Sequence, residues 1–436
     1  MKTVAIGIIG FGTVAKGVVE VLEKNAREIE RRCGYRLQVK AVARRSWEGV
    51  DTQMLSFVCS DNPYSLIEDE DIEIILELAG GVDLAGQYIE AALLRGKHVV
   101  TANKALIATR GQALFDLARE RGLELAYEAA VAGGIPIIKV LREGMSGNQV
   151  LQVAGIINGT SNFILTAMTE QGSDFAEVLT EAQALGYAEA DPTFDIDGTD
   201  AAHKITILAS IAFGIELQFE GVYKEGIDHI NAEDLQYADE LGFRIKHLGL
   251  AIRRNNGVEI RVHPTLIPKN ALLSSVSGVM NAVQVNGNAL GEGLYYGAGA
   301  GALPTASAVI ADLIDVVREL NLSQEDRLAE FGFHQLHNKT ALPVLPSDEF
   351  HSSYYLNLRV VDKVGVLAEV TKIFAKSEIS IASIIQKNAL AHENVVTLII
   401  LTNLVKESSM NAALEQLQTL EALRGQIKRI RVEFLG

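Results

Sequence analysis

The first 130 residues alternate short β-rich runs with longer helical patterns, and this alternation constrains the fold more than any other feature of the chain. Strands that alternate with helices of this length favour a parallel sheet with helices on both faces. We therefore predict a doubly wound α/β domain over residues 1–130. Its predicted strands are Val4–Ile9, Leu37–Ala43, Ile72–Leu78, His98–Thr101 and Leu123–Glu128, and its predicted helices are Thr13–Arg31, Val82–Arg95 and Gly111–Arg121.

The pattern changes beyond residue 130, which indicates further domains. Residues 131–302 combine strand patterns with helices and predict an α+β domain. An apolar helix, at about residues 303–321, is expected to return to the first domain. Residues 322–350 are a predicted linker, and residues 351–436 show a compact βαββα pattern of ordinary domain size. The clearest elements are strands Gln149–Ile157, Gly257–Leu266, Tyr354–Val360, Ile384–Lys387 and Val395–Thr402, and helices Ala201–Ala212, Pro304–Leu320, Val366–Lys376 and Met410–Leu420.

Composition excludes several classes of function. The chain has 55 acidic and 39 basic residues, a formal net charge of -16, which would repel nucleic acids and anionic membrane surfaces. We expect neither as a partner. Its 2 cysteines, Cys33 and Cys59, cannot form a disulfide framework and fit a reducing compartment. No signal peptide or membrane-spanning run is visible, so a cytoplasmic protein is expected.

A GxGxxA pattern follows the first predicted strand. Gly10 would permit a tight turn, Gly12 would let the backbone approach a pyrophosphate, and Ala15 would let helix and strand pack closely. The amides at the start of the following helix would bind the phosphates. This context predicts a Rossmann-type dinucleotide site, with a purely structural glycine turn as the alternative.

The end of the second predicted strand bears on the choice of dinucleotide. Ala43 stands where an acidic residue would accept the ribose 2′-hydroxyl of NAD(H), and Arg44 and Arg45 follow it. Guanidinium groups bind phosphate through paired, charged hydrogen bonds. The sequence therefore favours NADP(H), with NAD(H) also possible; two solvated arginines on a loop are the alternative.

Acidic residues crowd the segment 182–204. Their mutual repulsion indicates a cationic ligand or partner, such as an ammonium-bearing substrate. Asp200 and Lys204 are four residues apart at the start of an apolar helix, so they share one face. A surface ion pair would also explain that spacing. The acidic residues are Glu189, Asp191, Asp195, Asp197 and Asp200.

The same segment resembles the signature of homoserine dehydrogenases, and the resemblance extends over essentially the whole chain. It implies reversible, NAD(P)H-dependent reduction of L-aspartate 4-semialdehyde to L-homoserine, in threonine, methionine and isoleucine biosynthesis. The middle domain would then be catalytic and dimer-forming, in a homodimer or homotetramer. The similar stretches are GFGTVAKG (10–17), TANK (101–104), EAAVAGGIPII (128–138), NGTSN (158–162), AQALGYAEADPTFDIDGTDAAHK (182–204) and GAGAGALPTA (297–306).

The resemblance assigns roles to individual residues. It implies that Lys204 is the general acid and base, that Lys104 is a second active-site lysine, and that Glu189, Asp200 and Tyr187 bind the substrate. A lysine whose pKa is lowered by burial can supply the proton that a developing alkoxide needs. The implied cofactor-binding residues are Gly10, Phe11, Gly12, Thr13, Val14, Arg44, Arg45, Thr101, Lys104, Gly186 and Gly301.

The family also implies a monovalent cation site, built from the Glu128 side chain and the carbonyls of Val131, Gly133 and Ile135. Oxygen-only ligation suits a hard cation, here sodium. From its position alone, Glu128 is better explained as an ordinary carboxylate at a strand end. The nine histidines show no ligand spacing, and we expect His203 to be a core or surface residue.

The C-terminal pattern, beginning YYLNLRVVDKVGVLAEV at residue 354, resembles an ACT domain of ferredoxin-like fold. Asp362 and residues 365–368 carry the match, whereas Val364 replaces the usual proline. Gly365 would allow a turn whose amides grip a ligand carboxylate. The resemblance implies feedback regulation by L-threonine, with a purely oligomerising module as the alternative.

Two rival functions remain open at this point. One is a regulatory protein that keeps the amino-acid sensor on a degenerate oxidoreductase body, which the intact Lys104, Glu189, Asp200 and Lys204 argue against. The other is a related reductase of another small amino-acid aldehyde. Because the dinucleotide pattern opens the chain, we expect no preceding kinase domain and a single catalytic activity.

Overall fold

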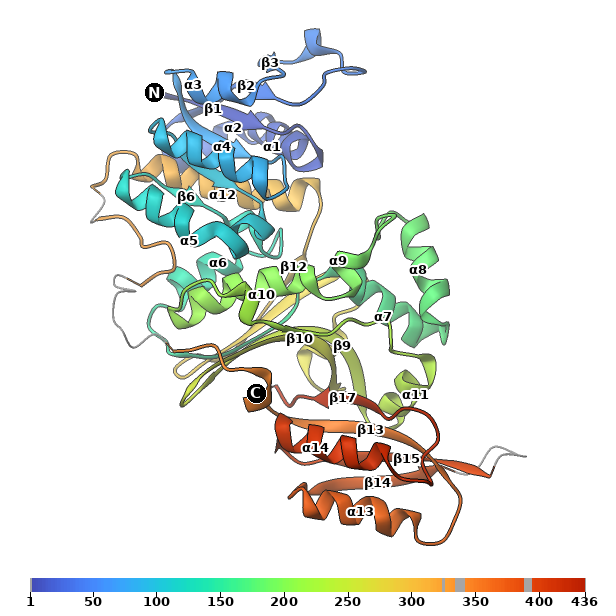
Figure 1. Ribbon diagram of the computed structural model, residues 1–436. Helices are drawn as coiled ribbons and strands as arrows, with labels where there is room; N and C mark the ends of the chain where they lie inside the picture. The colour runs from blue at the N-terminus through green and yellow to red at the C-terminus, as the bar shows by residue number, and fades with distance from the viewer. Residues whose placement is uncertain (1, 324–325, 334–341, 388–393, 436) are drawn as a thin grey trace.

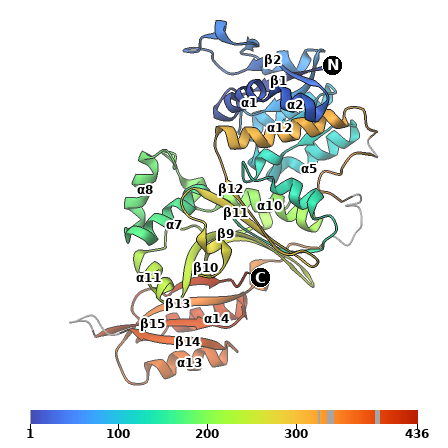
Figure 2. The same cartoon turned by 180° about the vertical axis from the view of Figure 1, so that it is seen from behind.

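The computed structural model describes residues 2–323, 326–333, 342–387 and 394–435. Figure 1 shows three regions stacked along one axis: the N-terminal sheet with its helices, a central sheet, and the C-terminal sheet with its two helices. The view from behind in Figure 2 shows the same order. None of the helices in these ranges is long and apolar enough to cross a membrane.

The N-terminal sheet is parallel and has the strand order β3-β2-β1-β4-β5-β6, which confirms the predicted doubly wound fold. Strand order reverses between β1 and β4, and open α/β sheets bind ligands at that switch point. The carboxyl ends of these two strands therefore mark the expected cofactor edge. The strands are β1 (Thr3–Ile9), β2 (Arg36–Ala43), β3 (Val58–Ser60), β4 (Ile72–Glu77), β5 (His98–Thr101) and β6 (Leu125–Ala126).

Two helix boundaries differ from the prediction because asparagines cap helices there. The single helix predicted over 13–31 is two helices, since the Asn25 amide ends the first and its carbonyl accepts the first amides of the second. The Asn103 side chain accepts the Leu106 amide and starts α5 earlier than predicted. The helices of this domain are α1 (Thr13–Lys24), α2 (Ala26–Cys33), α3 (Pro63–Glu68), α4 (Asp83–Leu94) and α5 (Lys104–Glu120).

Helix α12 (Ala302–Glu319) leaves the central domain and packs against α1 in the first domain. The contact is close because α1 carries Gly17, where a β-carbon would lie 2.5 Å from the carbonyl oxygen of Ala302. Ala306, Val309 and Leu313 are buried there with the apolar residues of β1 and α1. The chain thus crosses back after the central domain and completes the first one.

The remaining strands form one sheet of 11 strands that runs through both the central and C-terminal regions. We expected a separate C-terminal sheet, but β17, near the C-terminus, lies parallel to β10 and joins the two. The sequence prediction had assigned no strand to this segment. The strands are β7 (Val150–Ile156), β8 (Tyr223–Lys224), β9 (Phe243–Arg254), β10 (Gly257–Pro268), β11 (Met280–Gly287), β12 (Gly291–Ala298), β13 (His351–Val361), β14 (Ile381–Lys387), β15 (Val395–Thr402), β16 (Val405–Lys406) and β17 (Lys428–Val432).

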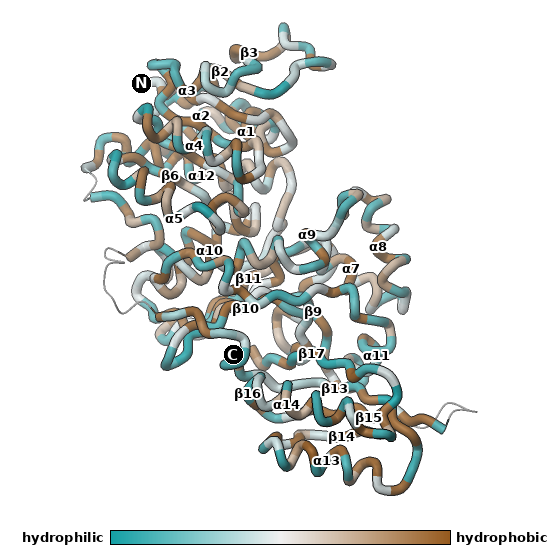
Figure 3. The backbone as a smooth tube through the Cα atoms, in the orientation of Figure 1, coloured by the Kyte–Doolittle hydropathy of each residue, from teal (hydrophilic) through white to brown (hydrophobic). Residues whose placement is uncertain are grey.

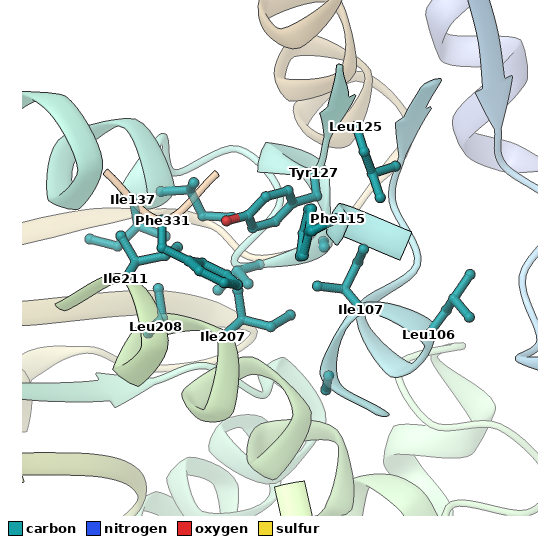
Figure 4. Close-up of a cluster of buried hydrophobic side chains, with 14 of the residues drawn as sticks. Leu106, Ile107, Phe115, Leu125, Tyr127, Ile137, Ile207, Leu208, Ile211 and Phe331 are labelled. Atoms are coloured by element: carbon teal, nitrogen blue, oxygen red, sulfur yellow. The ribbon is translucent and has the colours of Figure 1, made fainter. Parts of the chain in front are cut away.

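Helix α10 is buried along its whole length and links the first two regions. One side lies on β9 and β10, and the other packs against α5. Figure 4 shows Ile207, Leu208 and Ile211 of α10 beside Ile107 and Phe115 of α5. The other helices outside the first domain are α6 (Ile137–Lys139), α7 (Gly159–Gln171), α8 (Phe175–Ala184), α9 (Thr193–Ile196), α10 (Thr199–Phe213), α11 (Ala232–Glu240), α13 (Val366–Lys376) and α14 (Glu407–Gln418).

The outer helices are amphipathic, as a layered fold requires. In Figure 3, hydrophilic and hydrophobic residues alternate along outer helices such as α4, α5 and α8. The C-terminal core shows the burial that follows from such patterning: Val370 and Phe374 of α13 and Met410 of α14 are buried against the sheet. The βαββαβ order of this region agrees with the predicted ACT-like fold.

Candidate active site

A cleft of about 500 Å³ lies between the cofactor edge of the parallel sheet and the start of α10. It is bounded by the loops after β4 and β5 on one side and by the acidic segment on the other. The cleft is therefore shared by the first and central regions, where a cofactor on the sheet could meet a substrate on α10. Its lining includes Val14, Glu77, Gly80, Gly81, Asn103, Lys104, Glu189, Asp191, Phe194, Asp195, Asp200 and His203.

The glycine turn after β1 has the geometry that a phosphate-binding loop needs. Gly10 has a φ of +97°, and a β-carbon there would lie 2.6 Å from the Leu78 backbone. A β-carbon at Gly12 would meet no described atom within 4 Å. Protein packing therefore does not require glycine here, and the open space beside its backbone is available to a ligand. Thr13 begins α1, and the Gly12 carbonyl accepts the Lys16 amide. Phe11 instead packs against Trp47 and Phe57.

Glu77 organises the loops at this edge, and the sequence reasoning missed it. Its carboxylate is fully buried and accepts hydrogen bonds from the amides of Ala79 and Gly80 and from the Thr101 hydroxyl. The Thr101 side chain therefore faces Glu77, whereas we predicted that it binds the cofactor. A carboxylate at the end of an apolar strand was the available signal, since a buried charge needs such partners.

Arg44 and Arg45 lie just beyond β2. The Arg44 guanidinium lies 5.5 Å from the centre of the Trp47 ring, and Arg45 is exposed. Among the described residues, neither arginine pairs with a carboxylate. Both therefore remain available to an anionic group bound along the turn after β1.

Two lysines and an asparagine converge on Asp200. Its carboxylate lies 3.1 Å from Lys104 Nζ through one oxygen and accepts a hydrogen bond of 2.7 Å from Lys204 Nζ on the other. Lys204 also donates to the Ile157 carbonyl. The Asp200 and Lys204 side chains are only 9% and 11% exposed. The two residues do form an ion pair, but it is buried, so the alternative of a surface ion pair is wrong.

Asn158 is a second residue that the sequence reasoning did not single out. Its Nδ2 donates to Asp200 at 2.8 Å and to Asp195 at 2.7 Å, while its Oδ1 accepts the Ser161 amide at the start of α7. It therefore fixes Asp200 relative to β7 and α7. An asparagine between a strand and a helix is a common N-cap signal, but it does not reveal the long-range contact.

Burial and neighbouring charges set the ionisation of the cluster. Burial lowers the pKa of Lys204, and Lys104 lowers it further, whereas Asp200 opposes this shift. Burial would raise the pKa of Asp200, but the two lysines and Asn158 together hold it well below its usual range. The site thus keeps an ionised carboxylate beside a lysine that loses its proton more easily than an exposed one.

The acidic residues of the segment divide into two groups. Glu189 is exposed and lines the cleft, as expected for a substrate ligand. Asp191, which also lines the cleft, and Asp197, which does not, accept hydrogen bonds from Thr193 and Thr199 in their own turns. Part of the clustering therefore stabilises local turns.

Several predicted residues are not part of the cleft lining that the structure describes, among them Lys204, Tyr187, Gly186 and Gly301. Tyr187 packs against Phe163 with ring centres 5.0 Å apart, and Gly186 lies in an exposed left-handed turn after α8. Gly301 precedes α12 with a φ of +124°. His203 is buried between the rings of Phe194 and Phe219, so it occupies the core as expected.

Glu128 is almost completely buried at the joint between the first two regions. Its carboxylate accepts the amides of Ile138 and Lys139, while burial and the nearby Asp312 raise the pKa of Glu128 to about 8. No described donor reaches the carbonyls of Val131 and Gly133, whereas the Ile135 carbonyl accepts the Ile137 amide. Within the described chain, no group of three or more His, Cys, Asp or Glu side chains forms a metal site.

The turn before α13 has the expected form. Gly365 has a φ of +97° and directly precedes the helix, which is the left-handed turn that glycine allows. Val364 beside it is fully exposed. The predicted ligand-binding turn is therefore on the surface of the C-terminal region.

Comparison with protein families assigns all three regions. Residues 10–128 match the model described as the NAD binding domain of homoserine dehydrogenase, residues 136–314 match the model described as homoserine dehydrogenase, and residues 354–422 match the ACT domain. The chain is 51% identical to the homoserine dehydrogenase of Pseudomonas aeruginosa and 47% identical to that of Neisseria gonorrhoeae. Each alignment covers 100% of both chains.

Solved structures of homoserine dehydrogenases resemble this chain over most or all of its length. A crystal structure of a homoserine dehydrogenase from Thiobacillus denitrificans superposes with a TM-score of 0.95 at 49% identity, covering 100% of this chain and 99% of that one. A hyperthermophilic archaeal homoserine dehydrogenase in complex with NADPH superposes with a TM-score of 0.62 at 30% identity, covering 72% of this chain and 98% of that one.

Proposed function

Since the chain belongs to the homoserine dehydrogenase family of NAD(P)-dependent oxidoreductases, we propose that Lys204 is its proton donor and acceptor and that Asp200 positions both lysines and the substrate. The observation that carries this proposal is the convergence of Lys104 and Lys204 on the buried carboxylate of Asp200, which lines the cleft at the cofactor edge together with Lys104. The rival regulatory and alternative-reductase functions are not favoured.

The chemistry of the residues fits the reversible reduction of L-aspartate 4-semialdehyde to L-homoserine. A bound reduced nicotinamide supplies the hydride. Lys204 then gives a proton to the oxygen that was the aldehyde carbonyl, and in the oxidative direction it takes the hydroxyl proton. The lowered pKa of Lys204 makes both transfers easier near neutral pH. Lys104 would contact the same oxygen or share the proton.

The substrate also carries an ammonium group, for which the cleft offers carboxylates. Glu189 lines the same cleft as Lys104, and among the described residues its carboxylate accepts no hydrogen bond of the kind that holds Asp191 and Asp197 in their turns. We assign Glu189 to the substrate ammonium. The packing of Tyr187 against Phe163 supports at most an indirect role for that residue.

We also propose a preference for NADP(H). Ala43 leaves no carboxylate at the end of β2, and Arg44 and Arg45 are unpaired with carboxylates among the described residues. A 2′-phosphate beside the turn after β1 would meet these guanidinium groups, which bind phosphate well. The archaeal structure similar to this one was solved with NADPH.

A sodium ion at Glu128 is proposed as support for the joint between the regions. The proposal rests on the chemistry of the donors: a buried carboxylate, and carbonyls of Val131 and Gly133 that accept no described hydrogen bond, are oxygen ligands of the kind a hard monovalent cation takes. The Ile135 carbonyl could join this donor set although it already accepts an amide. The ion would have no step in the reaction.

Amino-acid regulation through the ACT domain, with L-threonine as the effector, and assembly as a homodimer or homotetramer complete the proposal. The exposed Gly365 turn before α13 supports a ligand site, because backbone amides at such a turn suit a carboxylate. The two alternatives for this domain, sensing and assembly, are separated by adding threonine to the assay described next.

The first experiment follows absorbance of the nicotinamide with aspartate semialdehyde and NADPH, then NADH, for the wild type and Lys204→Ala. Loss of the proton donor is expected to lower kcat by about 10² to 10⁴. Lys269→Ala, which removes an exposed lysine of the same domain paired with Asp239, serves as the control and should retain activity. Wild-type protein that oxidises neither cofactor would contradict the proposed function, and an active Lys204→Ala would contradict the role of that lysine.

A further inference from the structure

A buried arginine of the C-terminal domain reaches into the catalytic domain. Arg431 lies on β17 and is 1% exposed. Its Nη1 donates to Glu225 of the catalytic domain at 2.8 Å, while Nε and Nη2 donate to both oxygens of Glu407 at the start of α14. One guanidinium therefore bridges the two domains through charged hydrogen bonds, which are directional and strong when buried.

The backbone around Glu225 connects this contact to the acidic segment. Its amide donates to the Val262 carbonyl on β10, and its carbonyl pairs with His247 Nε2 on β9. Two residues later, the Ile227 amide donates to the Ile196 carbonyl at 2.9 Å. Glu225 is thus fixed to the sheet on one side and carries the end of α9 on the other.

The contact between these two segments leaves little space. A β-carbon at Gly226 would lie 2.6 Å from the Ile196 carbonyl oxygen, so a shift of the segment 225–227 must move residue 196 as well. Lys224 adds a second link, because its Nζ donates to the Thr199 hydroxyl and lies 3.4 Å from Asp197. Thr199 is the first residue of α10, directly before Asp200.

These hydrogen bonds, together with the backbone of residues 224–227 and 196–200, connect the ACT domain to the start of α10, where Asp200 lies. We infer that Glu225 is a positioning residue through which the ACT domain acts on Asp200 and Lys204. A change at the start of α14 would move Arg431, because separating a buried ion pair leaves an uncompensated charge. The inference rests on the proposed roles of Asp200 and of the ACT domain as a sensor.

A purely structural role is the competing explanation, in which the Arg431–Glu225 pair only holds the domains together. The joint has other buried pairs that could do this, such as Arg261 with Glu433 at 2.7 Å. A structural role changes the free energy of unfolding and leaves the catalytic parameters unaltered. A positioning role changes the substrate KM and the local protection of the segment that Glu225 carries.

The test compares Glu225→Gln with Glu233→Gln. The control residue is also a glutamate of the catalytic domain that pairs with an arginine of the ACT domain, Arg359 at 3.6 Å, and this pair involves neither Glu225 nor Glu407. For Glu225→Gln we expect the KM for homoserine to rise at least about fivefold with kcat altered less than about threefold. Hydrogen exchange at the Ile227 amide should quicken by about tenfold or more. Glu233→Gln should change neither the KM nor the exchange rate.

A third measurement adds threonine. Glu225→Gln should still bind threonine in calorimetry while its inhibition constant rises by about tenfold or more, and Glu225→Asp, which keeps the charge, should recover part of the response. Wild-type protein that neither binds nor responds to threonine would overturn the proposed effector, and the KM and exchange results would still decide the role of Glu225.

Wild-type KM and wild-type exchange in Glu225→Gln would show that the inference is wrong. If that variant proves too unstable to assay, Lys224→Met breaks the same connection at its other end, at an exposed side chain. It should raise the KM for homoserine in the same direction. An unchanged KM in Lys224→Met would then overturn the inference.

Discussion

Asp200 is the residue on which the geometry of the site depends. Three side chains from three elements, Lys104, Lys204 and Asn158, place their donors on its two oxygens. Removing either lysine leaves the carboxylate with two of these partners, whereas removing the carboxylate leaves two buried or half-buried ammonium groups without their anion. The consequence for proton transfer can be measured.

We predict that Asp200→Asn shifts the pH dependence of homoserine oxidation to lower pH. The negative charge of Asp200 raises the pKa of Lys204, while burial and Lys104 lower it, so neutralising Asp200 lowers that pKa further. Neutral Lys204 is the base, so the rising limb of kcat/KM should move to lower pH, with a rate loss of about ten- to hundredfold. Asp239→Asn, at an exposed residue that pairs with Lys269 and is not part of the cleft lining, should leave the pH of the rising limb unchanged. A limb that moves upward would contradict this assignment.

The two arginines after β2 give a second prediction. Arg44→Ala with Arg45→Ala should raise the KM for NADPH by about ten- to hundredfold, since hydrogen bonds between charged groups contribute about 1.5–3 kcal/mol. The KM for NADH should change little, because NADH lacks the 2′-phosphate. Arg36→Ala, at the opposite end of β2, is the control. Equal losses with both cofactors would show that these arginines do not select between them.

Among the elements, α12 has the most unusual position, since it belongs to the first domain in space and follows the second in sequence. Its packing against α1 depends on Gly17, whose missing side chain leaves room for the Ala302 carbonyl. Sequence analysis predicted the return of this helix from its apolar character and the glycine-rich stretch before it. Nothing in the sequence indicated that Gly17 would be the point of contact with α12.

We predict that Gly17→Ala destabilises the protein by about 1–3 kcal/mol, since a methyl group there would overlap a backbone carbonyl that cannot rotate away. The measurement is thermal or urea unfolding with and without NADPH. Gly147→Ala provides the comparison, because a β-carbon at that position meets nothing within 4 Å. If both variants unfold alike, the close packing of α1 and α12 contributes little to stability.

Most strands and helices of the first domain were predictable because their apolar periodicity is strong, but the short β3 and α3 were not predicted. The failures have local causes: asparagine caps divided the predicted helix over 13–31 and moved the start of α5. The segment of β17 reads KRIRV, and its basic residues obscure a strand whose arginine is buried by ion pairs and not by apolar packing. The periodicity of apolar residues alone does not identify such strands.

At the scale of the whole molecule, the joint between the first two regions contains two buried carboxyl groups, those of Glu128 and Asp312. We predict that sodium chloride raises Tm relative to choline chloride at equal ionic strength by roughly 2–5 °C, because a cation that binds only the folded state stabilises it. The gain should vanish in Glu128→Gln. A gain that persists in the variant would indicate a general salt effect and contradict the cation site.

The site was predictable to the extent that its residues form local motifs. Lys104, Glu189, Asp200 and Lys204 follow from recognisable stretches, and the structure brings all four to one cleft or its wall. The partners that hold them, such as Asn158 and Glu77, come from other elements, and no spacing in the sequence relates them. Likewise, the continuous sheet depends on pairing between residues 266 and 432, a separation at which sequence patterns carry no information.

The position of β17 also sets an order of assembly during synthesis. It lies downstream of every other strand and helix in the described chain, yet it joins the catalytic sheet to the ACT sheet and delivers Arg431 to Glu225. Domains fold as the ribosome releases them, beginning at the N-terminus. The nascent catalytic domain must therefore keep part of one sheet edge unpaired until residue 432 has emerged, and the coupling that we infer between the ACT domain and the active site can form only then.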